Sequence, residues 1–186
     1  MASPKPCAGS PSPCDECGAR CCKRFLVAVV PTDVERIAAR LRVPSSSFIE
    51  AYPAEKCNCV HAPSFWVDGK ENYIGLRREG SGCVFLSDGR CRIHSFKPIV
   101  CRTFPFCLNG GSVERSTFCG KEVRAEEGEK GLLERYEHEL KLLRRDAVEW
   151  NWRTGGEKGL GELLGFMQGK ARERRRISGI ISKLKF

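Results

Sequence analysis

The pattern of hydrophobic and polar positions divides the chain into a first part rich in strands and turns and a second part that is helical. The run 25–30 is apolar and rich in Val, which predicts a strand. Thr32 and Glu35 have the spacing of a capping box, and apolar residues then recur at helical spacing, so we expect a helix over 32–41. A second Ser-x-x-Glu spacing predicts a short helical stretch over 47–52.

Three glycine-containing turns follow. Asp68-Gly69 predicts a hairpin over 65–76, because Asp-Gly supplies the positive φ angles of a tight two-residue turn. Asp88-Gly89 predicts a second hairpin. Asn109-Gly110-Gly111 marks a third turn, in which Leu108 is expected to pair with Gly111.

The region after residue 121 has the period of helices. Charged residues separate apolar residues that recur every third or fourth position, which predicts an amphipathic helix within 122–150. Gly161, Gly165 and Gly169 recur at every fourth position beside Leu and Met residues, so we expect close packing of a second helix on the body of the protein. The longest apolar run, 25–30, is far shorter than the ~20 residues of a membrane span.

The composition is unusual in its number of cysteines and in the basic residues near the C-terminus. The 186 residues include 12 Cys, and the formal net charge is +9. The residues from Lys170 to Phe186 hold seven basic side chains and one acidic side chain, and their isoleucines recur at helical spacing. The N-terminus lacks the layout of a secretory signal, so we expect a cytoplasmic protein, in which clustered thiols are more often metal ligands or redox groups than disulfides.

These features predict one small, irregular α+β domain in which bound metal staples short strands and hairpins, with C-terminal helices packed on it. The expected order is a Pro/Ser-rich flexible leader (1–13), a cysteine-cluster metal-binding domain (14–120), packed helices (121–169) and a basic amphipathic tail (170–186).

The first cysteine cluster contains Cys14, Cys17, Cys21 and Cys22 within nine residues. Its C-x2-C spacing allows two sulfurs to reach one metal across a tight turn. Side chains of adjacent residues diverge, so we expect Cys21 and Cys22 to serve two sites, or one site and a supporting role.

The downstream thiols lie around the second and third turns. In a regular hairpin at Asp88-Gly89, Leu86 faces Cys91 and Cys83 lies about 10 Å further along. Either the chain bends there or the two cysteines belong to different clusters. Continuing the pairing expected at the third turn would place Cys119 beside Cys101.

The residues around these thiols identify a family. Gly82-Cys83-Val84-Phe85-Leu86, Gly89-Arg90-Cys91-Arg92-Ile93-His94, Lys97-Pro98 and 101–106, together with the N-terminal cluster, resemble the YkgJ-like cysteine-cluster proteins, which are described as zinc- or iron-chelating domains. The resemblance spans about Cys14 to Cys119. It departs from the family pattern in having three residues between Cys17 and Cys21, Lys97 in place of Arg, and His94 where Tyr is common. It implies eight metal ligands: Cys14, Cys17, Cys21, Cys22, Cys83, Cys91, Cys101 and Cys119.

Eight thiols suffice for two four-coordinate sites, and either Zn²⁺ or an iron–sulfur cluster such as 4Fe–4S satisfies that count. The tight first cluster favours iron–sulfur over paired zinc knuckles. Cys7, Cys57, Cys59 and Cys107 are then ordinary loop thiols, although Cys57 and Cys59 also have the spacing of a redox or accessory metal pair. His94 is expected to support the site by hydrogen bonding, with C-x2-H ligation as the alternative.

Three functional hypotheses follow. The first is a cytoplasmic metalloprotein with a structural, chelating or electron-transfer role. The second is a protein-modifying enzyme, because flagellin lysine N-methylases contain a similar cysteine cluster, although this chain has neither a methyl-donor loop nor a phosphate loop. The third is a zinc-stapled module that binds nucleic acid or an anionic surface through Lys170–Phe186.

Overall fold

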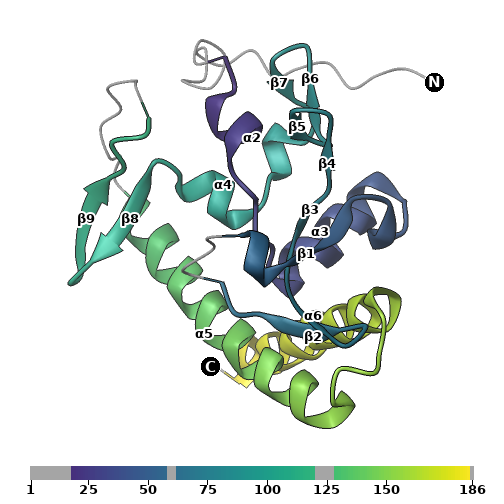
Figure 1. The fold of residues 1–186 in the computed structure, drawn as a ribbon. Coiled ribbons are helices and arrows are strands. Elements are labelled where there is room, and N and C mark those ends of the chain that lie inside the picture. The colour runs from purple at the N-terminus through teal and green to yellow at the C-terminus, as the bar shows by residue number, and fades with distance from the viewer. Residues whose placement is uncertain (1–17, 58–61, 120–127, 185–186) are drawn as a thin grey trace.

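The computed structural model describes residues 18–57, 62–119 and 128–184. The element order confirms the α+β class, with short antiparallel strand pairs followed by two long helices (Figure 1). The helices and strands are α2 (Arg20–Arg24), α3 (Pro31–Leu41), η1 (Ser45–Ser47), β1 (Ile49–Pro53), η2 (Ala54–Lys56), β2 (Phe65–Val67), β3 (Lys70–Leu76), β4 (Arg78–Glu79), β5 (Gly82–Cys83), β6 (Leu86–Ser87), β7 (Arg90–Cys91), η3 (His94–Phe96), α4 (Ile99–Thr103), β8 (Phe106–Asn109), β9 (Ser112–Arg115), α5 (Glu129–Thr154) and α6 (Leu160–Leu184).

A three-stranded antiparallel sheet with the order β1-β3-β2 forms the centre of the fold. β2 and β3 are joined by the predicted turn, in which Asp68 and Gly69 both have positive φ (51° and 73°). The hairpin predicted over 65–76 is therefore confirmed. β1 covers Glu50 to Tyr52, so the helical stretch predicted through those residues is wrong beyond the 3-10 turn η1.

The Val-rich run 25–30 is extended but is not a full strand. It makes one bridge, Ala28 to Gly75, with Val29 N–H bonded to Ile74 O and Leu76 N–H bonded to Val27 O. β2 is only three residues long and leaves this side of β3 open, so the run fills the gap. A Cβ on Gly75 would lie 2.9 Å from Val27 O, which is why this approach requires glycine.

The helical layer lies along the sheet, with α5 and α6 close to β2 in Figure 1. Trp150 of α5 is buried, donates its indole N–H to Trp66 O at 2.8 Å, and stacks at 5.4 Å on Phe166 of α6. α6 also packs along α3. The two C-terminal helices and the sheet therefore share one hydrophobic core.

The glycines of α6 do not make the predicted close contacts. A Cβ added at Gly161, Gly165 or Gly169 would meet no atom of the described residues within 4 Å. Leu163, Leu164 and Met167 turn inward instead. The prediction of glycine-mediated packing is therefore wrong, although the helix itself is present. None of the helices in the described part of the chain has the length and apolarity that crossing a membrane requires.

Candidate metal centre

The predicted ligands lie on separate short elements. Cys21 and Cys22 are in α2, Cys83 is in β5, Cys91 is in β7 and Cys101 is in α4. Figure 1 shows α2, α4 and the β4–β7 hairpins grouped at one end of the molecule. Cys119 follows β9. Cys14 and Cys17, like Cys7 and Cys59, lie outside the described residues.

A bend in the chain brings Cys83 towards Cys91. The residues between them form two small hairpins rather than one, because Cys83 pairs with Arg78 across β4–β5, whereas Leu86 pairs with Cys91 across β6–β7. The predicted register of Leu86 is thus confirmed. Main-chain hydrogen bonds of 2.8 Å, from Val84 N–H to Arg77 O and from Arg92 N–H to Phe85 O, hold the bend. Of the two alternatives left by the sequence, the chain bends.

Cys101 lies on a helix, not on a ladder shared with Cys119. The third turn pairs Asn109 with Ser112, so the predicted pairing of Leu108 with Gly111 is wrong. The reason is that Gly110 and Gly111 together form the two-residue turn, both with positive φ (56° and 84°). The segment carrying Cys101 is held at its start by Asp33, whose two carboxylate oxygens accept the Ile99 N–H at 3.2 and 3.1 Å.

Burial raises the pKa of the Cys101 thiol, and Cys83, Cys91 and Cys21 act in the same direction. Burial likewise raises the pKa of the Cys83 thiol. The elements that carry these four thiols, α2, β5, β7 and α4, lie together at one end of the molecule in Figure 1, and α2 contacts β5.

Cys21 and Cys22 have their Sγ atoms 4.0 Å apart. A hydrogen bond to Cys22 is the largest cause that raises the pKa of Cys21, and burial follows. Phe118, which precedes Cys119, packs on Phe25 at the end of α2 with ring centroids 4.4 Å apart.

The comparison with protein families supports a metal-binding domain. Residues 13–125 match the CxxCxxCC family model, described as "Putative zinc- or iron-chelating domain". The chain belongs to this family. No solved structure matches the chain significantly.

The donor set suits the metals named by the family description. Thiolates are ligands of both structural zinc and iron–sulfur clusters. None of the eight described cysteines forms a disulfide, so their sulfurs are available. Within the described residues no three His, Cys, Asp or Glu side chains form a closed ligand group. Neutral thiols have no attraction that would bring them to ligand distances, whereas deprotonation by a bound cation supplies one.

The remaining candidate residues lie on or beside three other elements, η3, η2 and β8. His94 is exposed in η3, with its Nε2 3.2 Å from Lys97 Nζ. Cys57 ends η2, and Cys107 is exposed on β8 with its Sγ directed to Glu114 O. Whether His94 supports the site stays a prediction.

Sequence reasoning missed the residues that orient the cysteine-bearing elements. Asp33 is only 2% exposed, and Arg36 and Arg78 donate to main-chain carbonyls around α4 and α2. An acidic residue at the start of a helix normally indicates interaction with that helix's own N-terminus. The sequence contains no signal that Asp33 instead receives the N–H of a residue 66 positions away.

Three of the seven basic residues of the C-terminal segment form ion pairs with other helices of the fold. Lys170 pairs with Glu149 at 2.6 Å and Arg174 pairs with Asp146 at 2.5 Å, while Arg175 pairs with Glu35 of α3. Residue 170 lies within the continuous helix α6. Binding of nucleic acid or an anionic surface by Lys170–Phe186 stays a prediction.

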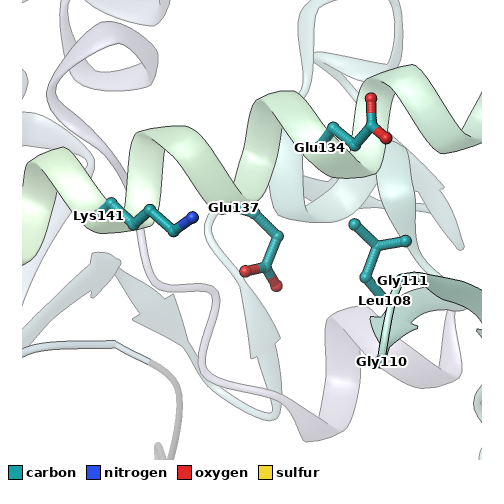
Figure 2. A pocket seen from close by; sticks show the side chains of 6 residues that line it. All are labelled: Leu108, Gly110, Gly111, Glu134, Glu137 and Lys141. Carbon is teal, nitrogen blue, oxygen red and sulfur yellow. The ribbon is translucent and has the colours of Figure 1, made fainter.

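A pocket of about 320 Å³ lies between the β8–β9 turn and α5. Figure 2 shows Glu137 directed into it, with Lys141 extending towards Glu137 and Leu108 closing the other side. Its lining is mixed apolar and charged, without the cysteines that characterise the metal centre.

Proposed function

We propose that the protein binds zinc or iron at a thiolate centre whose main role is to hold its short N-terminal elements together. The observation that carries this proposal is the grouping at one end of the molecule of four elements, α2, β5, β7 and α4, which carry Cys21, Cys83, Cys91 and Cys101. Four thiolates complete one tetrahedral zinc site or ligate one iron–sulfur cluster.

The remaining predicted ligands form a second set in this proposal. We place Cys22 in the second set because two adjacent residues do not easily ligate the same ion. Its Sγ lies 4.0 Å from that of Cys21, so the two sets would be neighbours. Cys14 and Cys17 precede α2 in the sequence, and Cys119 lies beyond β9 near the Phe25–Phe118 contact. We assign Cys14, Cys17, Cys22 and Cys119 to this second group, in a reducing, cytoplasmic setting in which thiols stay available.

The structural role follows from the size of the elements concerned. β4 to β7 have two residues each, and α2 and α4 have five each. Helices and hairpins of this length are not stable alone in water. Metal binding contributes folding free energy directly when the ligands come from such separate segments. A bound metal would therefore connect all four elements, and an iron–sulfur cluster would in addition supply electron transfer.

The test compares two cysteine substitutions in the full-length protein, purified anaerobically. We expect Cys101→Ser to lose about half or more of the metal, because a four-coordinate site that lacks one thiolate binds weakly. Cys107→Ser is the matched control, since Cys107 is exposed and lies outside the proposed ligand sets. Elemental analysis with acid-labile sulfide and visible absorption distinguishes iron–sulfur protein from colourless zinc protein. Full metal retention in Cys101→Ser would refute the assignment.

A further inference from the structure

Two arginines donate hydrogen bonds to main-chain carbonyls beside the helices that carry cysteines. We propose that Arg78 and the Asp33–Arg36 pair are positioning residues of the metal centre, which orient α2 and α4 so that their thiols face those of the two hairpins. This inference rests on the proposed function and identifies the residues that preorganise its site.

Arg78 connects α2 to the first hairpin. Its Nη1 donates to Phe25 O at 3.0 Å, and its Nη2 donates to Lys23 O at 2.6 Å and to Ser81 O at 3.1 Å. Lys23 is directly after Cys22, and Ser81 is two residues before Cys83. One guanidinium group therefore binds main-chain oxygens next to two proposed ligands that are about 60 positions apart in the sequence.

The position of Arg78 in the β4–β5 strand pair places it beside the segment that carries Cys83. Arg78 and Cys83 are opposite each other in the β4–β5 register. α2 ends at Arg24, so its last carbonyls have no donors from a following helical turn. A planar guanidinium carries five N–H donors and can satisfy several of these oxygens at once, which a lysine ammonium on a flexible stem does less well.

The Asp33–Arg36 pair does the same for α4. Asp33 is bonded to Arg36 and accepts the Ile99 N–H, while Arg36 donates to Phe96 O at 2.6 Å and to Lys97 O at 3.2 Å. The two side chains thus bind both donors and acceptors of the segment that leads into α4. Cys101 follows Ile99 by two residues, so its direction depends on this contact.

These contacts resemble outer-shell support around metal ligands in general. Groups that hold ligands through hydrogen bonds typically change metal affinity by about 10–100-fold when they are removed. The hydrogen bonds described for Arg78 all go to main-chain oxygens. We therefore expect an effect at the lower end of that range.

The experiment measures metal release from the full-length, metal-replete protein. Zn²⁺ or Co²⁺ is loaded, a chromogenic chelator is added, and the release rate is followed for wild type, Arg78→Ala, Arg78→Lys and Asp33→Asn. Arg153→Ala is the matched control, because Arg153 is exposed and pairs with Glu149 on the same helix, far along the chain from any cysteine.

We expect release to be about tenfold faster in Arg78→Ala, intermediate in Arg78→Lys and unchanged in Arg153→Ala. Asp33→Asn keeps an oxygen acceptor but loses the charge that binds Arg36, so its release rate should also rise. The thiolate-to-cobalt charge-transfer spectrum should change in the Arg78 and Asp33 variants while the far-ultraviolet circular dichroism stays the same.

Two results would overturn the inference. One is a release rate and cobalt spectrum in Arg78→Ala equal to those of Arg153→Ala. The other is a lowered melting temperature in Arg78→Ala with unchanged metal release, which would mean a purely structural role. Wild-type protein that binds no metal would refute the proposed function instead, so the two failures are distinguishable.

Discussion

Trp150 and Trp152 allow the same substitution to be tested in two opposite environments of one helix. Trp150 is 4% exposed, and its indole N–H donates to Trp66 O. Trp152 is 85% exposed. Both lie in the last two turns of α5, so helix propensity and position are nearly matched. Replacing each with Phe therefore separates packing from local preference.

The magnitude follows from what Trp150 contacts. Trp150→Phe removes the donor to Trp66 O, and the loss of such a bond changes stability by about 1–1.5 kcal/mol. It also removes ring atoms that pack on Phe166. Full truncation of a buried Trp costs about 3–5 kcal/mol, and Phe keeps part of the ring, so the substitution to Phe should cost less than the upper end of that range. We expect a loss of about 3 kcal/mol in total. For a chain of this size, that corresponds to a fall of roughly 6–12 °C in Tm.

The assay is thermal unfolding of the metal-replete protein, followed by circular dichroism at one protein concentration. Trp152→Phe should change stability by less than about 0.5 kcal/mol, because exposed substitutions away from special contacts have small effects. Equal Tm values for the two variants would refute the placement of α5 against β2 and α6. A larger fall for Trp152→Phe would show that the opposite face of α5 is buried.

Two further predictions concern glycine and charge. Gly75→Ala should destabilise the protein by about 1–3 kcal/mol, because the new Cβ meets the Val27 carbonyl. Gly165→Ala, in open space on α6, should stabilise the protein by about 0.5–1 kcal/mol. Urea unfolding measures both changes in stability, and equal changes would contradict the close approach at Gly75. The hydrogen bond from Lys170 lowers the pKa of Glu149. The pair therefore stabilises the fold at pH values above the ordinary pKa of a glutamate, and this contribution is lost as the pH falls through the lowered pKa. A double-mutant cycle with Glu149→Gln and Lys170→Met should give a coupling of about 0.5 kcal/mol at neutral pH and none in acid, and a coupling that persists in acid would disprove it.

The sequence predicted those parts of the fold that depend on local chemistry. The 65–76 hairpin and the Asp88-Gly89 turn follow from Asp-Gly pairs, and both are present. The helix expected from residue 32 is present as α3, which follows from its helical period. The capping box predicted at Thr32 and Glu35 is wrong, because Val30 is the N-cap and no side chain of the described residues caps this end of α3. The outcome at Gly110-Gly111 shows the limit of this reasoning. Two consecutive glycines allow more than one two-residue turn, so the register was set by the pairing of β8 with β9 rather than by composition.

The candidate site was predictable as a set of residues but not as an arrangement. The spacing of the cysteines identified the family, and the family match confirms it. The hairpin geometry could not show how Cys83 lies relative to Cys91, because the residues between them form two small hairpins with a bend at Val84 and Phe85. Asp33, Arg36 and their bonds to the start of α4 are long-range contacts. Contacts between segments some 60 residues apart carry no periodic signal in one sequence.

The C-terminal helices contact an element of the proposed metal centre, although the family match ends at residue 125. α4, which carries Cys101, packs on α5. Burial raises the pKa of Tyr136 on α5 to about 12, with the charges of Asp33 and Cys101 acting in the same direction. α5 in turn is fixed by Trp150 against β2 and α6. Because the hydrophobic core is continuous from Cys83 and Ile99 to Leu143 and Met167, loosening the helical layer would also disturb the orientation of Cys101.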